Sequence, residues 1–359
     1  MKRSIPTEAI GSIPRPPELQ DAYETYSRGE ISQEELEEIA LRATIDTIRR
    51  LEETGSSCIG DGEQRKFSGF ASYCLHGCSN IARDGVEISF SDGHSRYLPT
   101  LTRGPFHYAL RASSFLEITK QNTKSPIKQS VVAPSLLSLV YPNTGIEDYP
   151  RWQFQRDLIE QHTLEVRECL DAGAYKVQLD FTEGRFSLKV DPSGGLLESM
   201  VELINKGLAG FSDAERQRIG VHTCPGSDLD ATHSADIDYK DLLPTLFGID
   251  VGSYYIAMAS EEDPERALRL IKTLLRPGMR VFVGVIDPID PRIETPEEVK
   301  DRVLRAARFI PVDQLGTTDD CGFAPFLDDR TTSRETAFAK IRARVEGTRM
   351  AEALLLGSA

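Results

Sequence analysis

Three side chains that are common zinc ligands occur where we expect β-strands to end. His222 and Cys224 are two residues apart, and Cys321 lies near the other end of the chain. Because a strand alternates its faces, residues two apart point the same way, so His222 and Cys224 can share one target. An imidazole and two thiolates favour zinc over magnesium or calcium. Three protein ligands leave one coordination position open, which is typical of a catalytic zinc site.

A second interpretation of these residues stays open. A lone His-x-Cys pair also occurs by chance, and the alternative is a hydrogen-bonded core histidine beside two packed, inert thiols. A large chain with few cysteines has no disulfide framework. We therefore interpret the four other cysteines as buried or helical thiols: Cys58, Cys74, Cys78 and Cys169.

The elements that must position these residues alternate between short apolar runs and amphipathic helical stretches. This alternation predicts an α/β fold, and eight repeats of it predict a (β/α)8 TIM barrel in a single zinc-binding domain, residues 1–359. The eight expected strands are Glu8–Pro14, Ser57–Gly62, Ile127–Ala133, Tyr175–Phe181, Ile219–Cys224, Gly252–Met258, Arg280–Asp287 and Gln314–Asp320.

The spacing breaks once, between the second and third expected strands. Residues Val86–Phe90 alternate in polarity, and a turn signal follows at Asp92 and Gly93. We therefore expect a β-hairpin inserted over the barrel mouth after strand 2, followed by a helix near Tyr108–Lys120.

In such barrels the active site lies at the carboxyl ends of the strands. Several unusual polar residues of this chain fall at those ends, and their convergence from independent segments is stronger evidence than any one motif. They are Gly11 and Ser12, Asp61 and Glu63, Asp180 and Glu183, Asp287 and Asp290, and Asp319 and Asp320.

The composition argues against several other classes of protein. A net charge of −14 over 359 residues, without a basic tract, argues against nucleic acid and anionic membrane as partners. The amino-terminal residues lack an apolar signal core, and no apolar run reaches membrane-spanning length, so we expect a soluble cytoplasmic protein. Whether it forms a homo-oligomer stays open.

Six short motifs occur here in the order in which they occur in one known family. The chain resembles the catalytic barrel of cobalamin-independent methionine synthase and its single-barrel relatives, which include epoxyalkane:coenzyme M transferase. The family's long members carry a second, amino-terminal barrel that this sequence lacks. The matching pieces are Ile10–Pro14, Gly62–Arg65, Gln178–Asp180, His222–Cys224, Gly284–Asp287 with Pro291–Arg292, and Asp320–Gly322.

The resemblance implies zinc-dependent methyl transfer from a folate-type donor to homocysteine, a small thiol. The three residues named first match the family's zinc ligands. Glu63 and Asp180 match acids that hold the substrate's amino group, and Ser12 matches a residue at its carboxylate. The alternative for the two acids is a structural ion pair across the barrel mouth, with Arg65 or Arg185.

Two residues of the family pattern are missing. The family's fourth zinc ligand, a glutamate after strand six, aligns with Met258, and Glu261 follows three residues later. The family's catalytic histidine after strand seven aligns with Ile289. A folate nitrogen leaves poorly unless it is protonated, so Asp290 and His233 are our candidates for the proton donor.

We therefore expect a zinc-dependent thiol S-methyltransferase whose partners are a small thiol and a methyl or alkyl donor. One alternative is a C–S bond-forming enzyme like epoxyalkane:coenzyme M transferase, whose sulfonate thiol needs basic residues. The other alternative is a zinc-binding barrel without catalysis. The basic residues available for a sulfonate are Arg15, Arg65, Arg185 and Arg292.

Overall fold

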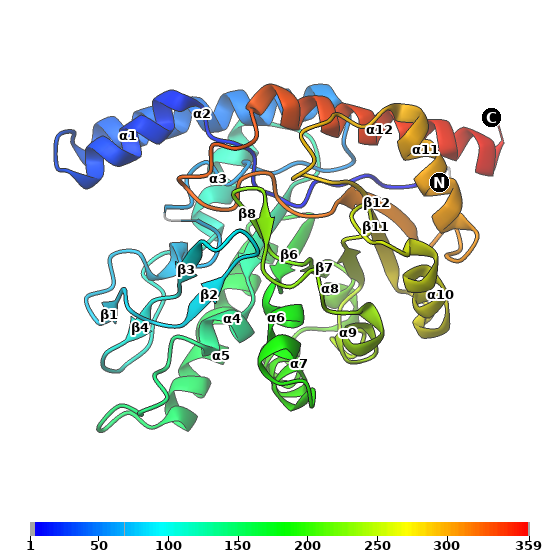
Figure 1. Cartoon of the computed structure of the whole chain (residues 1–359). Coiled ribbons are helices and arrows are strands. Elements are labelled where there is room, and N and C mark those ends of the chain that lie inside the picture. Colours follow the sequence, from blue (N-terminus) through cyan, green and yellow to red (C-terminus); the bar gives the residue numbers. More distant parts are fainter. Residues whose placement is uncertain (1–3, 68, 358–359) are drawn as a thin grey trace.

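A parallel sheet of six strands forms the centre of the protein in a computed structural model that describes residues 4–67 and 69–357 (Figure 1). The strands lie in the order β12-β11-β10-β7-β6-β5. Each lies within one of the predicted strands, so the expected α/β fold is confirmed. Residues 1–3, 68 and 358–359 of the predicted domain lie outside the described residues. The bounds are β5 Lys128–Val132, β6 Lys176–Asp180, β7 Ile219–Thr223, β10 Ser253–Ile256, β11 Arg280–Ile286 and β12 Leu315–Asp319.

The first two predicted strands, Glu8–Pro14 and Ser57–Gly62, are not regular strands. Each segment contains a glycine, Gly11 or Gly60, that weakens strand pairing, and Pro14 has no N–H to donate, which is consistent with their brief contacts. Isolated parallel bridges nevertheless connect β12 to Thr7, the residue before the first segment, the first segment to the second, and the second to the residue before β5. The parallel order thereby returns to its start, as in a (β/α)8 barrel. The bridges are Thr7 with Thr317, Glu8 with Cys58, and Ile59 with Ile127.

Helices cover the outside of the sheet, and α12 runs beside α2 in Figure 1. Ser32 and Thr295 form capping boxes with Glu35 and Glu298 at the starts of α2 and α11. These reciprocal bonds satisfy backbone N–H groups that the first turn leaves free. The helices are α1 Pro17–Ser27, α2 Gln33–Thr54, α3 Ser113–Asn122, α4 Pro134–Ser138, α5 Arg151–Asp171, α6 Glu183–Val190, α7 Gly195–Leu208, α8 Asp213–Arg216, α9 Tyr239–Leu246, α10 Pro264–Leu274, α11 Pro296–Ala307 and α12 Arg334–Leu356. No described helix is both long and apolar enough to cross a membrane.

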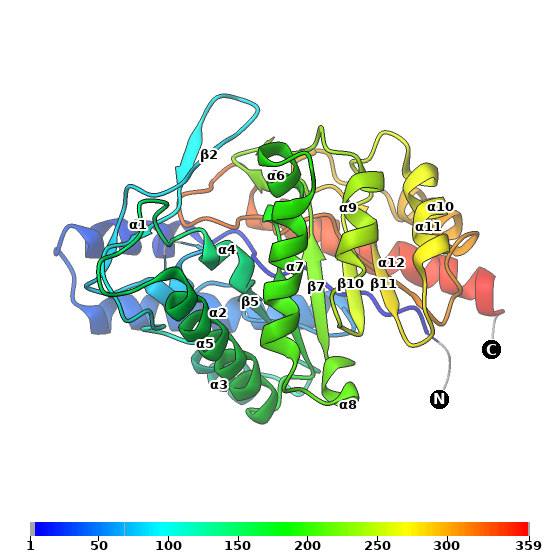
Figure 2. The ribbon, with the colours of Figure 1, turned by 90° about the horizontal axis from the view of Figure 1, so that it is seen from below.

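The predicted hairpin insertion is present. Strands β2 and β3 pair antiparallel, and Figure 2 shows that they stand on the side where the parallel strands end. The predicted helix near Tyr108–Lys120 is α3. Two further short pairs, β1 with β4 and β8 with β9, lie outside the main sheet. Their bounds are β1 Ile81–Ala82, β2 Glu87–Ser89, β3 Ser95–Tyr97, β4 Thr100–Leu101, β8 Ser227–Asp228 and β9 Ala231–Thr232, and a 3-10 turn spans Tyr73–Leu75.

The sheet buries charged pairs as well as apolar side chains. Lys176 Nζ lies 2.9 Å from Glu8 Oε1, and the hydroxyl of Tyr255 donates to Glu8 Oε2 at 2.5 Å. Arg344 of α12 pairs with Asp319 at the end of β12, where both side chains are buried. Because a buried charge without a partner is costly, these pairs tie the first segment and the last helix to the sheet.

Candidate active site

The three proposed metal ligands meet at the carboxyl ends of two strands that are distant in sequence. His222 lies in β7, Cys224 directly follows β7, and Cys321 lies two residues beyond β12. One ligand atom from each lies within 4.8 Å of the others, and all three residues are buried. The two Sγ atoms are 3.3 Å apart, and both thiols are free. The spacing argument from strand alternation therefore predicted a real cluster.

The donor set fits a soft divalent cation. The hydrogen bond from the Cys224 thiol, reinforced by His222, lowers the pKa of Cys321. The same contact raises the pKa of Cys224, so the pair favours ionisation of Cys321 over Cys224. His222 Nδ1 lies 3.4 Å from Asp180 Oδ1 and makes no hydrogen bond within the described residues. A carboxylate beside the ring of a metal-binding histidine is a common orienting partner.

A fourth protein ligand does not join these three among the described residues. The carboxylate of Asp320 is already engaged within the protein. It accepts hydrogen bonds from the backbone N–H groups of Met258, Ala259 and Ser260 at 2.7 to 2.8 Å. A Cβ on Gly284 would lie 1.7 Å from Asp320 Oδ1, so a glycine is needed there. These bonds tie the segment after β10 to the residue that precedes Cys321.

Glu261, the possible substitute ligand, points elsewhere. Its carboxylate pairs with Arg185, which also lies over the ring of Tyr239 at 4.0 Å. Arg185 is fully buried, and the pair therefore fixes both side chains. Met258, which the resemblance aligns with the family's glutamate, is a buried thioether and does not belong to the cluster of three possible ligands among the described residues.

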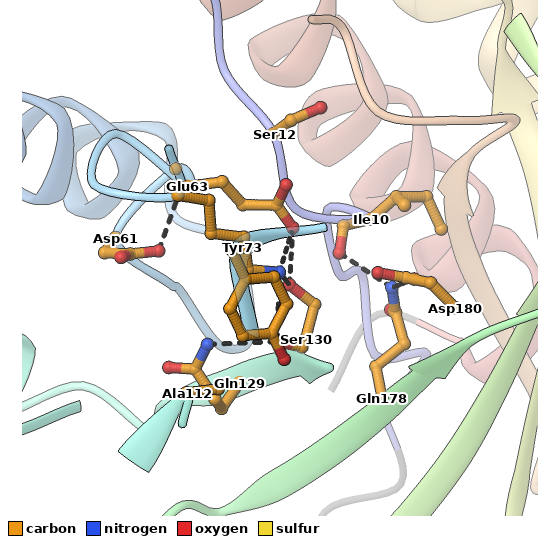
Figure 3. Close-up of polar contacts among 12 residues, drawn as sticks. Ile10, Ser12, Asp61, Glu63, Tyr73, Ala112, Gln129, Ser130, Gln178 and Asp180 are labelled. Carbon is orange, nitrogen blue, oxygen red and sulfur yellow. Dashed lines mark hydrogen bonds and ion pairs between the residues drawn. The ribbon is translucent and has the colours of Figure 1, made fainter. Parts of the chain in front are cut away.

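Glu63 is held at the cavity by a buried lysine that the sequence argument did not single out. Lys66 Nζ donates to Glu63 Oε1 at 3.0 Å and to Ser130 Oγ at 2.9 Å. Ser130 Oγ donates to the same carboxylate oxygen at 2.5 Å, and Figure 3 shows Ser130 beside Glu63. In the alternative interpretation Glu63 would pair with Arg65 or Arg185, whereas the structure pairs it with Lys66. Burial opposes the charge on Lys66, but Glu63 and then Asp180 outweigh it and raise the pKa of the ammonium.

The backbone at Glu63 is unusual for a residue with a side chain. Its φ is +59°, and its N–H donates to Asp61 Oδ1 at 2.9 Å. A left-handed conformation costs a non-glycine residue about 1–2 kcal/mol. Gly11 makes room for the carboxylate, since a Cβ there would lie 2.7 Å from Glu63 Oε1. The surrounding contacts thus hold this carboxylate in one place.

Asp180 and Ser12 complete the polar wall. Gln178 Nε2 donates to Asp180 Oδ1 at 2.7 Å and to the carbonyl of Ile10 at 3.0 Å (Figure 3). Ser12 Oγ accepts the backbone N–H of Ala324 at 3.3 Å. A Cβ on Gly322 would lie 2.1 Å from Ser12 Oγ, so this glycine lets the segment after Cys321 approach the serine closely.

These groups face one cavity of about 660 Å³. His222, Cys321, Glu63, Asp180 and Ser12 line its floor, and the inserted hairpin supplies much of its apolar wall. The apolar and aromatic lining residues include Leu75, Ile88, Phe90, Leu136, Phe186 and Phe326. A cavity of this size accommodates two small reactants, since drug-sized sites measure about 300–1,000 Å³.

The hairpin is fastened across the cavity by charged groups. Arg96 of β3 donates to Asp228 at 2.5 Å and to Asp328 at 2.9 Å. His94 Nε2 also lies 3.1 Å from Asp228, a fully buried carboxylate. The ring of Phe90 stacks on His94 with centroids 4.4 Å apart. These contacts therefore connect the hairpin to the β8–β9 loop and to the segment after β12.

Comparison with known families identifies the chain. Residues 5–349 match the family described as cobalamin-independent synthase, catalytic domain. The chain belongs to this family.

Individual relatives agree with the family match. A relative from Sulfurisphaera tokodaii, named methionine synthase, is 22% identical over 96% of this chain and 92% of its own length. YxjH of Bacillus subtilis, an uncharacterized protein, is 25% identical over 95% of this chain and 93% of its own length. A B12-independent methionine synthase from Shewanella sp. W3-18-1, solved with selenomethionine, has a TM-score of 0.79 at 21% identity and covers 99% of this chain and 100% of its own.

Within this cobalamin-independent synthase domain, the two candidate proton donors lie in different places. His233 is buried and lines the cavity, and Nδ1 lies 2.7 Å from Ser234 Oγ. Burial, aided by Lys189, lowers the pKa of His233 to about 4. Asp290 is not among the described cavity-lining residues, and its carboxylate lies 3.7 Å from the guanidinium of exposed Arg292. The structure therefore brings His233 to the other site residues and does not bring Asp290.

Two residues of this synthase site were missed or left without a role from the sequence alone. Lys66 follows Glu63 by three residues, a spacing that one turn of chain brings together. Glu183 follows Asp180 by three residues, is buried and lines the cavity. The same short spacing was the signal available for both.

Proposed function

We propose that this protein transfers a methyl group from a folate-type donor to a small aminothiol, with homocysteine as the first candidate, at a zinc ion held by His222, Cys224 and Cys321. The cluster of three soft donors beside a cavity is the observation that carries the proposal. Family membership and relatives named methionine synthase support the same chemistry. When zinc is bound, its charge lowers the pKa of a coordinated thiol and supplies a thiolate nucleophile at neutral pH.

The remaining residues bind and orient the aminothiol. Glu63 and Asp180 bring two carboxylates to the cavity, and Lys66 brings one ammonium between them. This balance leaves one negative charge for the substrate's ammonium, and charge-assisted hydrogen bonds are stronger than neutral ones. Ser12 Oγ, also at the cavity, is proposed to donate to the substrate's carboxylate. His233 and Asp290 remain the candidates named for the proton on the leaving nitrogen.

The proposal is tested by loading the protein with zinc and adding homocysteine. We expect about one zinc per chain and a new zinc–sulfur distance in X-ray absorption when homocysteine is present. Methionine should then form when 5-methyltetrahydrofolate is added. A zinc-loaded protein that binds homocysteine through zinc but forms no methionine with this donor would limit the proposal to thiol binding, and a protein without zinc affinity would end it.

Alkylation of a sulfonate thiol such as coenzyme M, the second candidate, is less well supported. Two of the four arginines named for it are occupied: Arg15 donates to the backbone carbonyls of Glu63 and Lys66, and Arg185 pairs with Glu261. Arg65 is not among the described residues that line the cavity. Arg292 pairs with Glu298 outside the cavity. Acidic groups at the cavity floor favour an ammonium over a sulfonate. The same X-ray absorption experiment with coenzyme M in place of homocysteine shows which of the two thiols binds to zinc. A protein that retains zinc but gains no zinc–sulfur distance with either thiol would favour the non-catalytic barrel.

A further inference from the structure

Glu183 is a buried acid at the cavity for which neither the family pattern nor the proposed substrate contacts supply a role. It is the first residue of α6 and follows Asp180, the last residue of β6, by three positions, and the Asp180 carboxylate acts on it electrostatically. Its exposed fraction is 2%, and it lines the same cavity as His222 and Cys321. Glu183 therefore belongs to the cavity wall and is almost inaccessible to bulk solvent.

The carboxyl group of Glu183 is only half satisfied. Ser135 Oγ, from α4, donates to Oε1, whereas Oε2 is buried and has no hydrogen-bond partner within the described residues. An ionised carboxylate would not tolerate such a setting, because a buried charge needs partners. A protonated carboxyl fits it, since the proton can reside on the oxygen that has no donor nearby.

The charges around Glu183 also favour the protonated form. Burial raises the pKa of Glu183 to about 8, and the carboxylate of Asp180 adds to this effect. The cations on its own helix are directed elsewhere: Arg185 pairs with Glu261, and Lys189 pairs with Asp236. Helix α4 contributes the Ser135 hydroxyl, and neither α7 nor α9, the helices that pack on α6, places a charged group among those that shift the pKa of Glu183 within the described residues. The proton on Glu183 is therefore available near neutral pH.

We propose that Glu183 is the residue that delivers a proton to the leaving nitrogen of the methyl donor. This assignment rests on the proposed methyl transfer. The thiolate sulfur forms a bond to the methyl carbon, the carbon–nitrogen bond breaks, and its electron pair on nitrogen takes the proton from Glu183. The products are a thioether, a secondary amine and the Glu183 carboxylate. The thiol releases one proton when it binds as a thiolate. The Glu183 carboxylate takes up one proton after the transfer, so the protons balance and no other reactant is consumed.

Glu183 is better suited to this role than the two groups named from the sequence. His233 lines the cavity, but its lowered pKa leaves it neutral near pH 7, where it has no extra proton to give. Asp290 is not among the described residues that line the cavity, so its carboxyl group is not placed beside the reactants. Effective general acids have a pKa near the working pH, which singles out Glu183.

The test compares Glu183→Gln with Glu165→Gln, a matched change at another buried acid that does not line the cavity. Two methyl donors are used with zinc-loaded protein and homocysteine: 5-methyltetrahydrofolate, whose nitrogen needs a proton, and iodomethane, whose iodide does not. We expect Glu183→Gln to slow transfer from the folate by about 10²–10⁴-fold, as loss of a general acid does. In Glu183→Gln, the zinc content, the affinity for homocysteine and the rate of methyl transfer from iodomethane should stay within about threefold of wild type.

Further readouts separate proton delivery from a structural role. Glu183→Asp should recover part of the folate rate, and the wild-type rate should fall as pH rises above about 8. Equal losses with both donors, or full folate activity in Glu183→Gln, would overturn the assignment. If wild type transfers methyl from neither donor, the proposed function fails, and infrared difference spectra of wild type minus Glu183→Gln still decide the state of Glu183. A protonated-carboxyl band at pH 7 supports the inference, and its absence refutes it.

Discussion

The sulfur atoms of Cys224 and Cys321 lie 3.3 Å apart although 97 positions separate the two residues in the chain. Both thiols are buried and free, and His222 lies within reach of the same point. Two thiols held this closely cannot both ionise without a cation between them, because like charges at short range repel strongly in a buried site. The fold therefore creates a site whose fully ionised form needs a metal.

Removing one of these sulfurs should abolish metal binding. We predict that Cys321→Ser, which replaces a soft ligand with a poor one, reduces zinc from about one ion per chain to near zero after dialysis. Cys169→Ala, at a buried thiol outside the cluster, should keep its zinc. Metal analysis of the three proteins gives the answer, and a Cys321→Ser protein that retains zinc as wild type does would contradict the proposed ligand set.

The sequence predicted the cluster well because strand alternation is a local rule. His222 and Cys224 share a face by their spacing, and the six regular parallel strands could be placed from their apolar runs. The two segments at the start of the barrel were placed correctly but expected to pair more fully. Their pairing depends on prolines, glycines and distant partners such as Thr317, which periodicity does not describe.

The partners of individual charges could not be predicted in the same way. The alternative considered for Glu63 was an ion pair with Arg65 or Arg185, yet Lys66 is its partner and Arg185 pairs with Glu261. Which cation reaches a buried acid depends on loop conformation and on the direction of each side chain, and these follow from tertiary packing.

The two acids at the cavity should recognise the amino group of the thiol. We predict that Glu63→Gln weakens homocysteine binding about 10- to 100-fold, because hydrogen bonds to charged groups contribute about 1.5–3 kcal/mol. The loss should be small for 3-mercaptopropionate, which has no amino group. Asp180→Asn should also weaken homocysteine binding, and its zinc content is measured alongside because Asp180 lies 3.4 Å from His222 Nδ1.

Binding constants of both thiols to wild type and variants form a double-mutant cycle that isolates this contact. Equal losses for the two thiols would show that Glu63 supports the site through Lys66 and not through the substrate. A larger loss for 3-mercaptopropionate would contradict the assignment outright.

The hairpin over the cavity should depend on its charged fastening. In Arg96→Gln the buried Asp228 loses its main cation, and breaking a buried pair costs about 3–5 kcal/mol. We expect faster amide hydrogen exchange in residues 87–97, with little change in the sheet. The double variant Arg96→Gln/Asp228→Asn should restore much of the protection, because the unpaired charge is gone.

Arg103→Gln is the control for this experiment, since exposed Arg103 lies in the same insertion and contacts only Ser79 among the described side chains. Unchanged exchange in Arg96→Gln would mean that apolar packing, such as that of Phe90 on His94, holds the hairpin without the ion pairs. Exchange that increases equally in Arg103→Gln would mean that the insertion is generally unstable.

A buried acid outside the cavity should give the protein a distinct pH dependence of stability. Glu165 of α5 accepts hydrogen bonds from Tyr73 Oη at 2.8 Å and from the backbone of Ala112 at 2.9 Å. Burial raises the pKa of this carboxyl to about 7. Because the folded carboxyl holds its proton more tightly than the unfolded one, its stabilising contribution is complete below about pH 4 and is lost as pH rises through about 7.

Replacing this acid with an amide should remove that pH dependence. One pKa unit corresponds to about 1.4 kcal/mol, so we predict that the free energy of unfolding of wild type falls by about 2–3 kcal/mol relative to Glu165→Gln between about pH 5 and pH 8. His162 and His233, whose pKa values burial lowers to about 3 and about 4, act in the opposite direction, but both proteins retain them. Their effect therefore cancels in the difference. Urea unfolding at several pH values measures the difference in the free energy of unfolding between wild type and Glu165→Gln. If this difference stays constant across the pH range, Glu165 is already ionised in the folded protein.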